Sequence, residues 1–338
     1  MTRQRRPWLG LAILSLTALA AVLLRLVVAR PLDGSIAFGW PTADVAGLRT
    51  GAVLAGACTG IALAIAGAML QALLRNPLAD PFILGGSSGA GLGVMAATYL
   101  AHVTGVLAWT SLGAVAPASV GAVLALVAVT ALGHRRTGLD PLSLVLAGVV
   151  VSAMCGAAIM FLQQIVPHGL RGDLVVWMMG RVPETTPRGV LATAWVIAVG
   201  GLVFGIALGR AMDAAALDDD EARSVGVSLG RLRLLLLVAS GILAAAAVAV
   251  AGPLAFVGLI APHAARIVLG PRHAPLVAGS ALCGIVLVVG ADAIRQVLEI
   301  GGGRLPVGVL TAALGGPLFL WLLHRGPGAT GTGEEWRP

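Results

Sequence analysis

Long apolar runs separated by short polar breaks dominate this sequence. From Gly51 to Leu74, about 24 consecutive apolar or small residues could cross a hydrocarbon core of about 30 Å as one helix. Between turn signals, the pattern predicts ten such runs. They lie at 8–29, 51–74, 87–105, 112–132, 142–163, 189–209, 232–251, 254–270, 274–294 and 306–323. The expected fold class is therefore an all-α polytopic membrane protein with about ten transmembrane helices.

The most abrupt polar break is the segment RNPLADP, which follows the second run. Asn76 precedes Pro77, and Asp80 precedes Pro81. A residue before proline avoids the right-handed helical region, and proline itself has no backbone N–H to donate. No helix can continue through this segment, so the chain must turn between its second and third spans.

Composition supports the membrane assignment and excludes several classes of enzyme. Hydrophobic residues make up 58% of the chain, charged residues 11%, and the mean hydropathy is +0.96. All of the 22 basic residues are arginine. A phosphate-binding GxxxxGK[ST] loop and a Schiff-base enzyme both need lysine, so any ATP must be hydrolysed by a partner. The net charge of +7 comes without an RNA-binding motif, and we expect no nucleic-acid partner.

Other kinds of chemistry find little support in the residue pattern. The cysteines Cys58, Cys155 and Cys283 stand singly in apolar spans, which favours packing over metal binding, and we expect no cofactor. No acidic residue lies at the centre of a span, whereas an ion-coupled carrier usually needs one there. This absence favours a transporter that is powered by another protein, and a secondary transporter is the alternative class. An intramembrane enzyme would need a buried catalytic constellation, and no HExxH or GxSxG motif occurs.

The spans divide into two halves of five. The first half covers 1–170 and the second 186–338 of a single transmembrane domain, 1–338. An odd number of spans per half makes the second half enter the membrane from the opposite face, which predicts an inverted repeat. More arginines fall on the side of the N- and C-termini, so we expect both termini to be cytoplasmic.

Two motifs stand out in the chain. The first is a helix ending Gly67-x-x-x-Gln71, then RNPLADP and an SSGA helix start. The second is a G-P-x-x-F-x-G-L-x-x-P-H-x-x-R-x-x-x-G pattern between Gly252 and Gly270. Both resemble motifs of the FecCD permeases, the membrane subunits of ABC importers for ferric siderophores, haem and cobalamin. The resemblance implies the type II ABC importer permease fold in a bacterial cytoplasmic (inner) membrane. It also implies a substrate, for which we expect a ferric siderophore, with haem or cobalamin as alternatives.

The same resemblance implies the partners of the chain. They are a dimer of ABC ATPase subunits, an extracytoplasmic substrate-binding protein, and a second permease copy that is either identical or a related paralogue. Membrane lipid surrounds the assembly. The span at 142–163 is our candidate for the wall of the translocation path.

The longest predicted cytoplasmic connection, 211–231, carries the expected ATPase contact. Its acidic residues stand where a short helix would begin, and Gly226 can end that helix. By resemblance, this helix docks into a cleft of the ATPase; the alternative is a solvated loop. The coupling residues are Asp220, Glu221, Ala222, Arg223 and Gly226.

By resemblance, two gates are expected at the ends of the path. Asn76, Pro77 and Leu78 would form the cytoplasmic gate, and the alternative is a plain turn. Trp177, Met178 and Gly180 would form the outer gate. Because tryptophan favours the membrane interface, an anchoring helix is the alternative there.

Two further sets of residues are assigned from the family motifs. Arg49, Arg295 and Arg304 are expected to dock the binding protein, although the family's R-x-P-R signature is incomplete at Arg49 and Arg304 stands where an acidic residue is usual. Arg304 could instead anchor lipid head groups. The structural motif residues are Gly67, Gln71, Pro262, His263 and Arg266. His263 and Arg266 share a helix face, and their alternative role is binding of substrate or metal.

Overall fold

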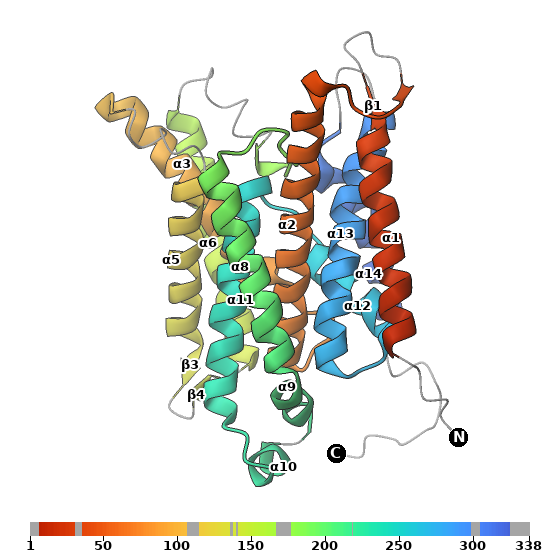
Figure 1. Ribbon diagram of the computed structural model, residues 1–338. Coiled ribbons are helices and arrows are strands. Elements are labelled where there is room, and N and C mark those ends of the chain that lie inside the picture. Colours follow the sequence, from red (N-terminus) through yellow and green to blue (C-terminus); the bar gives the residue numbers. More distant parts are fainter. Residues whose placement is uncertain are drawn as a thin grey trace.

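The computed structural model shows a bundle of helices, most of which run along one axis (Figure 1). The structure describes residues 7–30, 36–106, 115–135, 138–139, 141–166, 177–217, 219–298 and 305–324. The helices of the first half are α1 (Pro7–Val27), α2 (Ala43–Leu74), the 3₁₀ turn η1 (Pro81–Leu84), α3 (Gly86–Thr104), α5 (Val115–Gly133) and α6 (Pro141–Ile165). Those of the second half are α8 (Arg188–Ala207), α9 (Gly209–Ala215), α10 (Asp219–Ser224), α11 (Leu229–Ala251), α12 (Val257–Leu269), α13 (His273–Val297) and α14 (Val307–His324).

Two short antiparallel pairs of strands lie in the connections between helices. Strand β1 (Val28–Ala29) pairs with β2 (Ala37–Phe38) after α1, and β3 (His134–Arg135) pairs with β4 (Gly138–Leu139) after α5. Each strand has two residues. The protein is otherwise helical over its described residues, as the sequence predicts.

Each expected span corresponds to a helix, but not every helix is long enough to cross a membrane. Among the described residues, seven helices are long and apolar enough to cross a membrane. Helix α12 has 13 residues and extends about 20 Å, which is too short for the full crossing expected at 254–270. The cause lies just before it, where Gly252 and Phe256 both have positive φ (71° and 66°) and interrupt the helix around Pro253.

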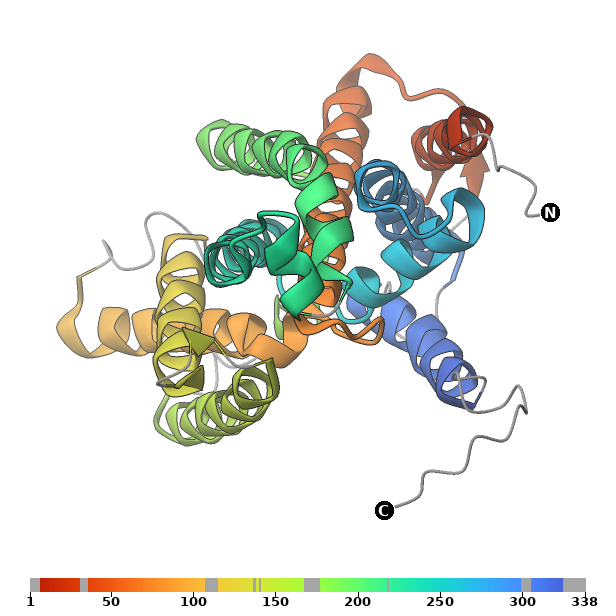
Figure 2. The same ribbon diagram turned by 90° about the horizontal axis from the view of Figure 1, so that it is seen from below.

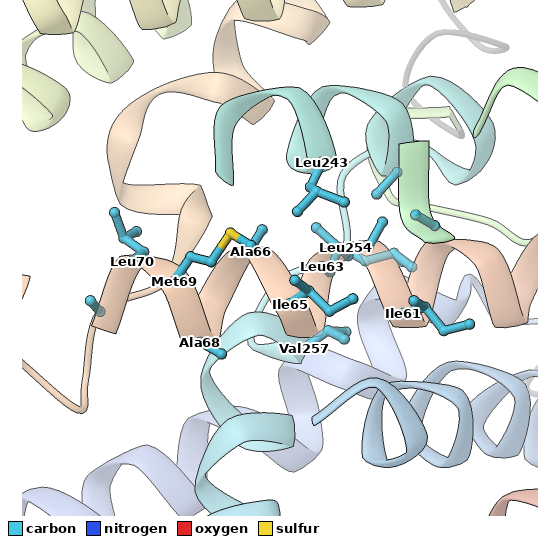
Figure 3. Close-up of a cluster of buried hydrophobic side chains, with 14 of the residues drawn as sticks. Ile61, Leu63, Ile65, Ala66, Ala68, Met69, Leu70, Leu243, Leu254 and Val257 are labelled. Carbon is cyan, nitrogen blue, oxygen red and sulfur yellow. The ribbon is translucent and has the colours of Figure 1, made fainter. Parts of the chain in front are cut away.

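Helix α2 occupies the centre of the bundle. Its sequence is apolar on all sides rather than on one face, a pattern typical of a helix that is buried all round. In its most apolar window, 94% of the residues are buried inside the chain. Figure 3 shows Leu63 and Ile65 of α2 in a cluster of buried side chains that includes Leu243 of α11 and Leu254 and Val257 at the approach to α12.

Glycines let the neighbouring helices come close to α2. A Cβ atom added at Gly60 would lie 2.2 Å from the carbonyl oxygen of Gly284 in α13. A Cβ at Gly67 would lie 1.8 Å from the carbonyl oxygen of Gly258 in α12. Both distances are far shorter than any van der Waals contact, so these positions exclude every other residue. The close approach of the α2 and α12 backbones is the physical reason for the expected structural role of Gly67.

The packing of the two halves is reciprocal. Helix α2 packs on α11, α12 and α13, whereas α11 packs on α2, α3 and α5. Each of these two helices is the second span of its half, and each contacts the second, third and fourth spans of the other half. They run in opposite directions (Figure 1), and from below α3, α5 and α6 group on one side of the bundle with α1, α12, α13 and α14 on the other (Figure 2). This is the arrangement that an inverted repeat produces. The precise limits of the halves, 1–170 and 186–338, stay a prediction.

The close approach at Gly67 leads to a first prediction. Gly67→Val should destabilise the protein by about 1–3 kcal/mol or more, because its side chain must push α12 away from α2. Gly200→Ala in α8 is the matched control, since nothing lies within 4 Å of the added carbon. Thermal unfolding of both variants in lipid nanodiscs measures the difference. Equal melting temperatures would show that α12 can move away from α2 without loss of stability.

Candidate functional site

At the end where α2 stops, Arg75 turns the chain away from the helix axis. Its backbone is left-handed, with φ 48° and ψ 33°. The N–H of Arg75 donates to the carbonyl oxygen of Ala72 (3.4 Å), and the N–H of Asn76 donates to that of Gln71 (3.1 Å). These bonds satisfy carbonyl groups that the helix end would otherwise leave unpaired.

The predicted cytoplasmic gate residues form the turn that follows. Asn76 and Pro77 are exposed and Leu78 is half-buried. The side-chain oxygen of Asn76 accepts from the N–H of Leu78 at 2.9 Å, a local bond that suits asparagine in a turn. The turn then re-enters the bundle, where Asp80 is buried and accepts from the N–H of Phe82 at 2.8 Å to start η1. Sequence reasoning did not single out Asp80, although its place before Pro81 is the signal for such a cap.

Helix α10 projects beyond the ends of the long helices on this side of the bundle (Figure 1). Of the predicted coupling residues, Asp220, Glu221, Arg223 and Gly226 are exposed and Ala222 is buried. Gly226 ends the segment with φ 85°, as its expected stop role requires. A short helix with one buried anchor and an exposed charged face can act as a rigid contact.

Asp219, the first residue of α10, ties three segments together. Its carboxylate lies 2.6 Å from a guanidinium nitrogen of Arg75 and 3.1 Å from one of Arg233 in α11. The Nε of Arg75 also donates to the carbonyl oxygen of Ala215 in α9 at 2.7 Å. Partial burial raises the pKa of Asp219, but the charges and hydrogen bonds of Arg233 and Arg75 outweigh it and hold that pKa below its usual value. Sequence reasoning named neither Asp219 nor Arg75 as a site residue.

Gln71 joins α2 to α12 within the bundle. Its side-chain nitrogen lies 3.4 Å from the carbonyl oxygen of Gly258 and 3.5 Å from that of Ala79, and its oxygen accepts from Arg266 at 3.1 Å. Arg266 therefore bonds to Gln71 across the helix interface, while His263 is half-buried on the same helix. Pro262 lies buried inside α12. Over the described residues, no group of three or more histidine, cysteine or acidic side chains could hold a metal ion.

A second contact between the α9–α10 segment and the bundle lies at the start of α13. One carboxylate oxygen of Asp213 in α9 lies 2.8 Å from the backbone nitrogen of His273 and 2.7 Å from its Nδ1. Helix α13 then runs the length of the bundle to Val297. The short helices α9 and α10 are thus attached to α2, α11 and α13.

The opposite end of the bundle contains a buried cluster of charges. Asp292 in α13 is 1% exposed and pairs with Arg25 of α1, which is 2% exposed, and with Arg295, which is 9% exposed. Arg25 also lies 3.8 Å from Glu184, and Arg295 donates to the carbonyl oxygen of Val182 at 3.2 Å. The cluster joins α1, α13 and the 182–184 segment.

This cluster changes the expected role of Arg295. A residue that docks another protein must present its side chain, yet Arg295 is buried and paired inside the bundle. Arg49 is half-buried and donates to the carbonyl oxygens of Leu26 (2.6 Å) and Gly39 (3.0 Å), where it closes the end of α1. Arg304 lies outside the described residues. The sequence placed Arg295 at the end of a span but could not show which residues surround it.

The predicted outer-gate residues lie between the two halves. Gly180 has φ 72°, its N–H donates to the carbonyl oxygen of Trp177 (3.0 Å), and its own carbonyl accepts from the N–H of Gly308 (3.2 Å). Trp177 and Met178 are half-buried and pack against a cluster contributed by α3, α5, α6 and α11. The rest of the expected gate helix, before Trp177, lies outside the described residues.

Comparison with known proteins agrees with this geometry. The model of the FecCD transport family matches residues 11–325. The chain is 37% identical to the cobalamin import system permease of Halobacterium salinarum, over 82% of this chain and 72% of that one. It is 36% identical to the hemin transport system permease of Yersinia pestis, over 82% of each chain. A solved metal-chelate type ABC transporter in an inward-facing conformation has a TM-score of 0.78 and 26% identity, covering 94% of this chain and 99% of that one.

The buried charge cluster gives a second prediction. Asp292→Asn should destabilise the protein by about 3–5 kcal/mol, because it removes the buried carboxylate that Arg25 and Arg295 share and leaves only Glu184, 3.8 Å from Arg25, to balance them. The control is Asp220→Asn, which removes a carboxylate that is 97% exposed and should leave the melting temperature nearly unchanged. Thermal unfolding in nanodiscs is the measurement. A similarly small effect of Asp292→Asn would mean that the two arginines reach water.

Proposed function

The chain belongs to the FecCD transport family, and on that premise we propose that it is the permease subunit of an ABC importer that takes up a metal chelate. The match of the family model to residues 11–325 carries this proposal, since it covers nearly all of the bundle. The two named relatives and the solved transporter support the same class of substrate.

The driving force is proposed to come from a separate dimer of ABC ATPase subunits. The exposed face of α10 supports this, because Asp220, Glu221 and Arg223 present charged side chains beyond the ends of the long helices. The contacts of Asp219 and Asp213 would pass a displacement of this segment on to α2, α11 and α13. The ATPase side, with both termini, is then the cytoplasmic side of a bacterial inner membrane.

The translocation path is proposed to lie between two permease copies. Among the described residues, a cavity of about 230 Å³ lies between α5, α8 and α11. Pockets that enclose small ligands are typically larger, about 300–1,000 Å³. Helix α6, our candidate wall, instead exposes a continuous apolar face that a second copy would cover. That face includes Leu142, Leu146, Val149, Val150, Met154 and Phe161.

Gating follows from the two turns that lead into this path. Asn76, Pro77 and Leu78 are the proposed cytoplasmic gate, and Trp177, Met178 and Gly180 the proposed outer gate. Support comes from their positions at opposite ends of the bundle. The first set follows the end of α2, and the second precedes the start of α8 and ends in the turn at Gly180. Arg49 and Arg304 stay in the proposal as docking residues for the extracytoplasmic binding protein, whereas Arg295 serves inside the bundle.

The cargo is proposed to be a ferric siderophore, with haem and cobalamin as second candidates. The curated relatives named above favour the second candidates, one being a cobalamin and one a hemin permease. All three are bulky metal chelates. A path with few polar contacts would release such a cargo rather than hold it.

Reconstitution tests the proposed function directly. Liposomes that contain the chain alone should accumulate no chelate against a gradient, because the chain has no lysine for a phosphate-binding loop. Addition of the ATPase dimer and a loaded binding protein should produce uptake that depends on ATP, and parallel assays with a ferric siderophore, haem and cobalamin would identify the cargo. Uptake by the chain alone under a proton or sodium gradient would instead establish a secondary transporter.

The contact at α10 can be tested with a pair of glycine variants. Gly226→Ala forces a side chain into a left-handed conformation at a cost of about 1–2 kcal/mol, so it should distort the end of the segment and weaken binding of the ATPase. Gly230→Ala is the control, because nothing lies within 4 Å of its added carbon and its φ is not positive. Co-purification with the ATPase is the measurement. Undiminished binding and transport by Gly226→Ala would count against the docking role.

A further inference from the structure

Arg75 holds a backbone conformation that arginine rarely adopts. Over the described residues, Arg75 and Phe256 are the two non-glycine residues with positive φ. In the left-handed region the Cβ atom crowds the neighbouring backbone, so such residues persist only where surrounding contacts hold them. Glycine is the residue usually found at this position after a helix. Contacts of the Arg75 side chain must therefore hold its backbone in this conformation.

The guanidinium group of Arg75 bonds to both sides of the link between α9 and α10. Its Nε donates to the carbonyl oxygen of Ala215, the last residue of α9, at 2.7 Å. Its terminal nitrogen donates to the carboxylate of Asp219, the first residue of α10, at 2.6 Å. Asp219 is itself held by Arg233 of α11. Arg75 thus clamps the link between the two short helices against the end of α2.

The backbone of Arg75 sets the direction of the proposed cytoplasmic gate. Asn76, Pro77 and Leu78 follow it directly, and the N–H of Asn76 bonds back to Gln71 because Arg75 is left-handed. If Arg75 returned to the right-handed region, the hydrogen bond between Asn76 and Gln71 would be lost and the turn 76–78 would move away from α2. Arg75 therefore contacts α9 and α10 through its side chain, while its backbone conformation sets the course of the proposed gate.

We propose that Arg75 is a positioning residue that converts displacement of α10 into movement of the cytoplasmic gate. While Ala215 and Asp219 accept hydrogen bonds from Arg75, they hold it in its left-handed conformation and keep the turn 76–78 in place. When the ATPase pulls α10 away, both contacts break and the strained backbone relaxes, so that the turn moves. This step rests on the proposed function for its driving force, but the clamp itself is a property of the chain alone.

Two substitutions at the same position separate this clamp from an ordinary surface ion pair. Arg75→Ala removes the clamp and keeps the backbone strain, whereas Arg75→Gly removes the clamp and relieves the strain. The clamp predicts that the turn loosens in Arg75→Ala and stays formed in Arg75→Gly. An ion pair without the backbone effect predicts that the two variants behave alike. Arg231→Ala, which removes an exposed charge near the start of α11, is the control.

Hydrogen exchange of the permease alone in nanodiscs gives the first readout. The amides of Leu78 and Ala79, both bonded within the turn, should exchange at least about fivefold faster in Arg75→Ala than in the wild-type protein. Arg75→Gly and Arg231→Ala should remain at the wild-type rate. Equal rates in Arg75→Ala and Arg75→Gly, whether fast or slow, would overturn the proposal. This outcome does not depend on any transport activity.

The full importer gives the second readout. Both Arg75 variants should lower the amount of chelate imported per ATP hydrolysed by at least about fivefold, because the gate no longer follows α10. The control variant should keep the wild-type ratio. An unchanged ratio in Arg75→Gly would overturn the proposal even if the exchange results agreed. Failure of the wild-type importer to transport any chelate would instead count against the proposed function and leave the exchange test valid.

Discussion

The contact on which the rest of this structure depends is the approach of the α2 backbone to α12 and α13. In a bilayer, helices gain little from the hydrophobic effect when they associate, since lipid tails are as apolar as leucine side chains. Association then comes from close packing, and Gly60 and Gly67 bring the helices to distances that no side chain permits. The central helix is enclosed on all sides as a result. Among the described helices, α1, α8, α11, α12 and α13 all pack directly on this centre.

The two ends of the bundle carry charges of different character. At the α10 end, the partners of Asp219 are partly exposed, so each pair is screened by water and can be broken at small cost. At the other end, Arg25 and Asp292 are buried, where the loss of one charge leaves the remaining buried charges unbalanced. Exposed pairs suit a segment that must shift during a cycle. Buried pairs suit a region where α1 and α13 must keep one arrangement.

Helix α13 connects these two ends. It begins where Asp213 of α9 bonds His273, and it carries Asp292 and Arg295 about five turns later. Along its length it packs against α2 through Gly284. A displacement of the short helices α9 and α10 therefore acts on a helix whose middle is held by α2 and whose far end is held by buried charges. Such an arrangement favours local movement at the α10 end over movement of the whole bundle.

Apolar periodicity and proline placement were enough to determine the helices, the turn at 75–81 and the class of protein. These are local consequences of residue type: a run of about 24 apolar residues can satisfy its backbone in a membrane only as a helix, and two X-Pro pairs end it. Gly67 and Gln71 stood out in the sequence, but their partners Gly258 and Arg266 lie almost two hundred residues further along the chain. Only the tertiary structure decided that Arg295 is buried, that α12 is too short to span a membrane, and that Arg75 contacts Asp219. Each of these depends on which distant segments become neighbours, and a single sequence carries no direct signal of that proximity.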